Sequence, residues 1–194
     1  MRPMGIEADT LAVHACLAHL LEILAWEDVR LYGRVPAISH WSPAQQVEHI
    51  AQAGLGMTAM IEKLEAGCAH ERIQPKGSPS VTGRAILLTG RIPRGRAEAP
   101  TGTLPAPIPA RAALVERVRD LSGAAAAIAA RASTLRQVRG VGRHPMLGWF
   151  SAAQWWRFLR VHTEHHLAVI ADIDRHPGVA EPVEVPTDPL GQTS

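Results

Sequence analysis

The stretch SAAQWWRFLRVHTEHHLAVIADIDR, residues 151–175, has the pattern of one long amphipathic helix. Ser151 and Gln154 form a Ser-x-x-Gln capping box, which marks the residue where a helix begins. The helix is expected to stop before the sequence His-Pro-Gly at residues 176–178, because proline cannot continue a helix. Its apolar residues recur at helical spacing, so one face of this helix is predicted to be buried.

Two histidines lie on that buried face. At about 100° per residue, His162 and His166 straddle the middle of the apolar stripe. A buried polar group without a partner costs roughly 1–3 kcal/mol, and histidines at i and i+4 can direct both rings at one metal ion. His165 falls at the edge of the face and Glu164 toward solvent, so the glutamate base of an HExxH protease is not supported. The spacing predicts a metal site, with hydrogen-bonded core histidines as the alternative.

Three more long helices are predicted, over residues 9–32, 42–65 and 109–135. The second begins with another capping box, formed by Ser42 and Gln45, and a proline follows Ser42 at the first helical position. The third is rich in alanine, the strongest helix former. The chain is therefore predicted to be all-α.

A long connection separates the second helix from the third. Residues 66–108 are rich in proline and glycine, and a short apolar piece at residues 85–88 is expected to pack on the helices. No strand pattern is long enough to predict a sheet. The sequence predicts one four-helix bundle over residues 1–178, followed by a Pro-rich tail over residues 179–194.

Composition restricts the classes of partner and compartment. The 194 residues have a formal net charge of +2, which gives little attraction for nucleic acid or an anionic membrane. No run reaches the roughly 18 apolar residues of a membrane span, and the N-terminus has no apolar signal segment. Cys16 and Cys68 form no CxxC motif, so a reducing cytoplasm is expected, with the two cysteines in the core or at the surface.

A third metal ligand should come from a neighbouring helix. His49, in the second helix, is the best candidate, although it lies at the rim of that helix's apolar stripe. His14 and His19 are five residues apart, which separates their faces, so they are interpreted as structural or surface residues. The remaining histidines lie at helix ends or in loops, where capping or solvent exposure is expected: His40, His70, His144 and His176. His144 and Pro145 are predicted to form part of a turn.

Two of these segments resemble motifs of the DinB-like superfamily. WSPAQQVEHI, residues 41–50, resembles its second-helix motif, and HPMLGWFSAAQWWRFLRVHTEHHLAVI, residues 144–170, resembles its fourth-helix motif. LLTGRIPRGRAEAP, residues 87–100, resembles the crossover of one subgroup. The resemblance implies an up-down-down-up four-helix bundle with a long crossover between helices two and three. It also implies a metal site at one end of the bundle.

Carried over to this sequence, the three metal ligands of the family are His49, His162 and His166. His165 matches the family's double-histidine position and is expected to support the ligands or face the substrate. Understood members of the family include an isomerase that uses mycothiol and transferases that use bacillithiol, and dimers are common. The resemblance therefore implies a divalent ion such as zinc or nickel, a thiol co-substrate, a small-molecule substrate and a homodimer.

Two functional hypotheses follow. The first is a metal-dependent thiol S-transferase or hydrolase, in which a metal-activated thiolate or water is the nucleophile. Arg91, Arg94 and Arg96 of the crossover could bind a substrate carboxylate, because the guanidinium fork matches its geometry; a solvated loop is the alternative. The second hypothesis is a protein that binds a metal or small ligand without turnover. Nucleic-acid binding through the arginine-rich crossover is disfavoured by the net charge.

Overall fold

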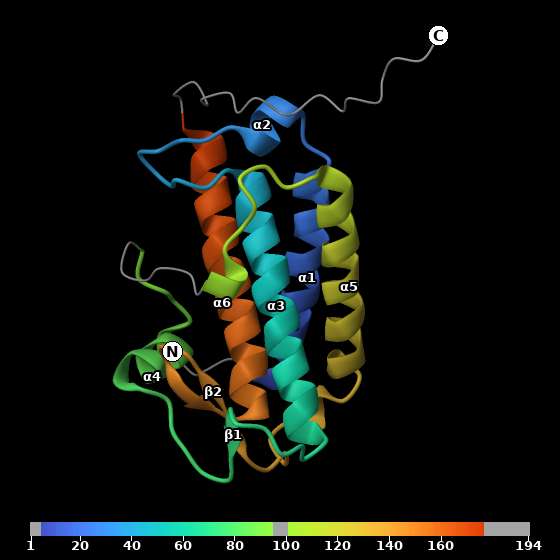
Figure 1. Cartoon of the computed structure of the whole chain (residues 1–194), viewed down its shortest axis with the longest axis vertical. Coiled ribbons are helices and arrows are strands. Elements are labelled where there is room, and N and C mark those ends of the chain that lie inside the picture. Colours follow the sequence, from blue (N-terminus) through green and yellow to red (C-terminus); the bar gives the residue numbers. More distant parts are fainter. Residues whose placement is uncertain (1–4, 95–100, 177–194) are drawn as a thin grey trace.

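Four long helices lie side by side in the computed structural model, which describes residues 5–94 and 101–176. They are α1 (Ile6–Leu24), α3 (Pro43–Glu65), α5 (Arg111–Ala129) and α6 (Ala152–Arg175). α1 and α6 run in one direction, while α3 and α5 run in the other (Figure 1). α3 packs against α5 and α6, and α1 packs against the same two helices. Because α3 and α5 are parallel, the chain between them has to cross the whole length of the bundle.

Both predicted capping boxes are present. The backbone N–H of Gln45 donates to Ser42 Oγ (3.4 Å), and the Gln45 side-chain oxygen accepts from Ser42 N (3.1 Å). Ser151 and Gln154 make the same reciprocal pair at the start of α6. These caps fix the first turns of the two helices that carry the candidate histidines.

The predicted continuous helix over residues 9–32 is wrong, because α1 ends at Leu24 and a separate short helix, α2 (Asp28–Tyr32), follows. The reason is a tertiary contact. Arg111, at the start of α5, donates to the backbone oxygens of Leu24 and Trp26. Carbonyls left without partners at a helix end need such donors, so α5 stabilises the break.

The prediction of an all-α chain is also wrong in one respect, since a small antiparallel sheet is present. Its strands are β1 (Ile73–Gln74), β2 (Val141–His144) and β3 (Gly148–Phe150), in that order. It lies beside the end of the bundle where α6 begins (Figure 1). Gly148 has a φ of +86°, and a Cβ there would meet backbone atoms of residues 78–80, so glycine is required next to this turn.

The connection between α3 and α5 contains further short elements. α4 (Val81–Thr89) includes the apolar piece expected at residues 85–88, and its Ile86 and Leu87 are buried. After α4 the chain returns through a 3₁₀ turn, η1 (Thr101–Thr103), and a second such turn, η2 (Ala132–Thr134), follows α5. The third long helix was predicted over residues 109–135, whereas α5 covers only Arg111–Ala129. Arg96 and the predicted Pro-rich tail lie outside the described residues.

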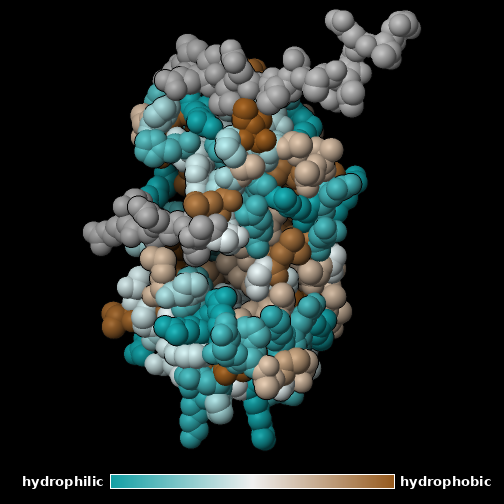
Figure 2. Space-filling model, viewed as in Figure 1, coloured by the Kyte–Doolittle hydropathy of each residue, from teal (hydrophilic) through white to brown (hydrophobic). Residues whose placement is uncertain are grey.

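The bundle interior holds one large apolar core, and a small separate apolar cluster lies near the end of α6. Large side chains from all four long helices are almost fully buried, among them Leu20, Ile50, Leu121 and Trp156. On the face drawn in Figure 2, the most hydrophobic residues are scattered rather than gathered in a broad patch. None of the helices in the described ranges combines the length and hydropathy that a bilayer crossing requires.

Candidate metal centre

Three histidine rings meet between α3 and α6. The ring centroids of His49 and His166 are 4.6 Å apart, as are those of His162 and His166, and those of His49 and His162 are 5.0 Å apart. One nitrogen from each ring lies within 4.8 Å of the other two, and this is the three-residue metal-compatible cluster found among the described residues. The structure therefore brings together the three histidines singled out in the sequence.

The spacing of these nitrogens suits a single ion. His49 Nε2 and His162 Nε2 are 3.1 Å apart. In a tetrahedral zinc site with Zn–N distances of about 2.0–2.1 Å, neighbouring ligand nitrogens lie about 3.3 Å apart. A change of a few tenths of an ångström would thus allow the two rings to share an ion.

The second nitrogen of two rings is held by an oxygen acceptor. His49 Nδ1 lies 2.7 Å from the backbone oxygen of Thr103, and His166 Nδ1 lies 2.6 Å from Gln46 Oε1. The Gln46 amide nitrogen donates to Ser39 Oγ (3.0 Å), which fixes the direction of the amide. Because these acceptors require a proton on Nδ1, Nε2 keeps its lone pair in both rings. This is the tautomer that metal-ligating histidines use.

His162 is held differently. It is 9% exposed, and its Nδ1 has no hydrogen-bond partner among the described residues. Because His49 Nε2 carries a lone pair, a proton on His162 Nε2 can be donated to it across the 3.1 Å contact. A shared ion would replace that hydrogen bond and leave all three Nε2 atoms as donors of electron pairs. The donor set, three neutral imidazoles, is one that zinc accepts.

Burial keeps the cluster neutral. Desolvation lowers the pKa of His49, and it lowers the pKa of His162 and His166 well below the ordinary value of 6.5. Mutual repulsion between the rings lowers the pKa of His162 and His166 further. Since a metal binds neutral imidazole, the site is ready for a cation at neutral pH.

The comparison with protein families agrees with the fold and the cluster. A family model described as the DinB superfamily matches residues 12–170. The chain belongs to the DinB superfamily. The matched range includes all three clustered histidines. No curated protein and no solved structure matches the chain significantly.

In this DinB-superfamily chain, the other candidate residues, His165, Arg91 and Arg94, differ in their burial and in their contacts. The ring of His165 is half-buried with its centroid 5.0 Å from that of His166. Its pKa is lowered by burial and by the nearby guanidinium of Arg94. Arg94 itself forms an ion pair with Asp172 (2.6 Å), and Arg91 is exposed. Arg94 thus lies close to His165, and its guanidinium already has an acidic partner.

His144 departs from the expected solvent exposure. Its Nδ1 accepts from the backbone N–H groups of Met146 and Leu147 (3.2 Å each), as the predicted turn requires. Its ring, however, packs among aromatic side chains, and burial lowers its pKa to about 4. The ring partners are Phe150, Trp155 and Phe158. The turn prediction is therefore right and the exposure prediction wrong.

The remaining histidines and cysteines considered as ligands lie apart from the cluster. His14 and His19 are exposed on α1, as predicted, and His19 pairs with Glu22 (2.7 Å). Cys16 is buried, Cys68 is exposed, and both are free thiols.

Two residues that support the rings were missed by sequence reasoning. Gln46 precedes His49 by three positions, so helical spacing places both on one face of α3, and this signal was available. Thr103 contributes a backbone oxygen from the crossover, and no pattern marks it. Metal-ligating histidines commonly donate their second ring N–H to an oxygen acceptor of this kind, which fixes the orientation of the ring.

Replacing Gln46 with alanine is expected to weaken metal binding about 10–100-fold, because the His166 ring would lose the acceptor on Nδ1. Titration of the metal-free protein with zinc against a competing chelator measures the change. Gln52, also on α3 but outside the cluster, provides a control: Gln52→Ala should bind zinc as the wild type does. Equal affinities for Gln46→Ala and the wild type would contradict the orienting role.

Proposed function

We propose that this DinB-superfamily protein is a metal-dependent enzyme, a thiol S-transferase or a hydrolase. His49, His162 and His166 would hold one divalent ion, zinc or nickel. The observation that carries this proposal is the convergence of the three rings, with Nδ1 of His49 and of His166 engaged by oxygen acceptors. A structural zinc site ordinarily has four protein ligands, whereas three histidines leave one position open. The donor set therefore favours a reactive centre.

The chemistry assigned to the metal is activation of a nucleophile: a divalent ion in such a site lowers the pKa of a thiol or water toward neutrality. The chain's own residues would position and shield the reactants. The ring of Trp41 packs against His49, with centroids 5.0 Å apart, and Leu104, which follows Thr103 in the crossover, is 49% exposed. These side chains offer apolar contact to a small-molecule substrate.

His165 and the crossover arginines complete the proposal. His165 is proposed to support the ligands or face the substrate, and Arg94 and Arg91 to attract a substrate carboxylate. Arg94 would have to exchange its contact with Asp172 for the substrate, so its contribution is proposed to be smaller than that of an unengaged arginine. We further propose a homodimer, which the resemblance to the family implies.

A protein that binds a metal or a small ligand without turnover is the second candidate. The observation in its favour is the depth of the cluster, since His49 is only 4% exposed and His162 9%. A deeply buried ion would be held firmly and would have little room for two reactants.

A turnover screen separates the two candidates. Untagged protein loaded with zinc or nickel would be incubated with mycothiol, bacillithiol or glutathione and a set of electrophiles, and loss of free thiol measured. Ester and amide hydrolysis would be measured in parallel, with His162→Ala as the matched inactive control. Metal-dependent turnover absent from the control supports the enzyme. Stoichiometric metal without turnover supports the binding protein. Absence of metal binding contradicts the enzyme and leaves, of the second candidate, only a protein that binds a small ligand.

A further inference from the structure

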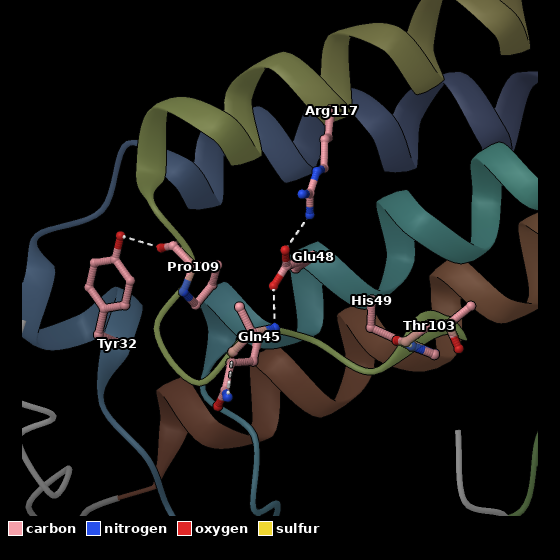
Figure 3. A network of polar contacts seen from close by, with 8 residues as sticks. Tyr32, Gln45, Glu48, His49, Thr103, Pro109 and Arg117 are labelled. Carbon is pink, nitrogen blue, oxygen red and sulfur yellow. Dashed lines mark hydrogen bonds and ion pairs between the residues drawn. The ribbon is translucent and has the colours of Figure 1, made fainter. Parts of the chain in front are cut away.

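A proline-rich strap, residues 103–109 with the sequence TLPAPIP, runs along the first half of α3 beside the histidine cluster (Figure 3). Its three prolines alternate with other residues and carry no N–H group. The strap consequently cannot pair along its length as a strand would. Side chains of the bundle have to hold it in place.

Glu48 provides a buried anchor for the strap. The residue is 4% exposed, and its Oε2 accepts from the backbone N–H of Ala106 (2.7 Å). Its other oxygen accepts from the guanidinium of Arg117 on α5. Figure 3 shows the carboxylate between these two partners, with the strap on one side and α5 on the other. A buried charge held in this way resists displacement, because a lost partner would leave it uncompensated.

Further contacts fix the strap on either side of that anchor. The amide of Gln45 donates to the backbone oxygens of Ala106 (3.0 Å) and Pro107 (3.1 Å). Beyond them, the hydroxyl of Tyr32 donates to the oxygen of Pro109 (3.1 Å). The strap is thus attached at successive carbonyls, and Glu48 holds the backbone N–H of Ala106.

The strap connects Glu48 to a candidate metal ligand. Thr103 lies three residues before Ala106, and its backbone oxygen accepts the Nδ1 proton of His49 (2.7 Å). Adjacent residues in a helix point about 100° apart, so Glu48 reaches α5 while His49 reaches α6. Three residues span about 10 Å at most, so the place of the Thr103 oxygen depends on where Ala106 is held.

We propose that Glu48 is a positioning residue of the metal centre. By holding Ala106, it keeps the Thr103 oxygen against His49 and so directs His49 Nε2 toward the other two rings. This inference rests on the proposed function, because it assigns a role in metal binding. The alternative is that Glu48 only joins α3 to α5 through Arg117.

The chain contains a matched control for that alternative. At the other end of the same two helices, α3 and α5, Glu65 is paired with Arg131, whose Nε and Nη2 lie 2.8–3.0 Å from the carboxylate. This ion pair joins α3 to the segment that directly follows α5, and it is remote in sequence from the strap contacts. Loss of Glu65 tests the effect of weaker helix pairing alone.

Cobalt(II) titration followed by visible absorption tests the proposal, because the spectrum reports ligand number and geometry. Glu48→Ala should bind cobalt about 10–100-fold more weakly with an altered spectrum. Glu48→Gln should recover most of the affinity, since its amide oxygen can still accept from Ala106. Glu65→Ala should keep the wild-type affinity and spectrum even where urea unfolding shows lower stability.

Ala106→Pro provides the second test, because it removes the N–H group and leaves the pair of Glu48 with Arg117 intact. Like Glu48→Ala, it should weaken cobalt binding. If Glu48→Ala does not fold, Ala106→Pro alone tests whether the contact between Glu48 and the strap supports metal binding. Wild-type affinity in Ala106→Pro, or an equal loss in Glu65→Ala, would overturn the positioning role. Failure of the wild-type protein to bind cobalt would instead overturn the metal centre, and this inference with it.

Discussion

Replacing His162 with alanine is expected to reduce bound metal from near one equivalent to near zero. His162 is the ring that faces His49 across 3.1 Å and also stands one helical turn from His166. Without it, two histidines remain, and two ligands are too few for a stable protein zinc site. Elemental analysis of untagged protein, after incubation with zinc and removal of free ion, measures the result.

His165→Ala is the matched control, because this residue belongs to the same HTEHH motif and is not part of the three-nitrogen cluster. It should retain near one equivalent of zinc. Circular dichroism should show that both variants keep their helical content. Metal retained in His162→Ala, or lost equally in His165→Ala, would contradict the assignment of the three ligands.

Acid is expected to destabilise the metal-free protein well above the pH at which carboxyl groups titrate. The ordinary histidine pKa is 6.5, and burial lowers that of His144 to about 4 in the folded protein. Between these pH values His144 is protonated in the unfolded chain and neutral in the folded protein. Unfolding therefore becomes more favourable as the pH falls from 6.5 toward 4. This difference corresponds to about 3 kcal/mol of unfolding free energy for His144.

The clustered histidines also lower the free energy of unfolding as the pH falls. The pKa values of His49, His162 and His166 are all lowered by burial, so each contributes stability at neutral pH that disappears on acidification. Asp9 acts in the opposite sense. Burial raises the pKa of its carboxyl group, so the folded protein takes up this proton at a higher pH than the unfolded chain does.

Urea unfolding at about pH 7 and about pH 5, with a chelator present, measures this dependence. The variant His144→Asn keeps an acceptor for the turn amides and cannot take up a proton. It should lose less stability between the two pH values than the wild type does. Equal stability of the wild type at both pH values would contradict the burial of these neutral rings.

The long helices and part of the site could be predicted from local sequence patterns. The two capping boxes are complete within four residues each, so the beginnings of α3 and α6 were predicted to within a residue. The pair His162 and His166 followed from helical geometry alone. His49 was the best candidate for the third ligand on its place in the second helix, and the resemblance supported it, but its position at the rim of an apolar stripe gave no indication of its deep burial.

The features that escaped prediction depend on contacts between distant residues. The break after Leu24 is stabilised by Arg111, and the residues of strand β1 pair with partners 67 and 69 residues further along the chain. Strands of two to four residues are too short for an alternating pattern to stand out. The Thr103 oxygen belongs to the backbone, which every residue possesses, so only the folded crossover identifies it as a partner of His49.

The central claim is that His49, His162 and His166 bind one divalent ion, and anomalous diffraction tests it most directly. Crystals of the zinc-loaded protein would be measured on both sides of the zinc absorption edge. We predict one strong anomalous peak at about 2.0–2.1 Å from the Nε2 atoms of all three histidines. A map without that peak, or with zinc bound by other residues only, would contradict the claim.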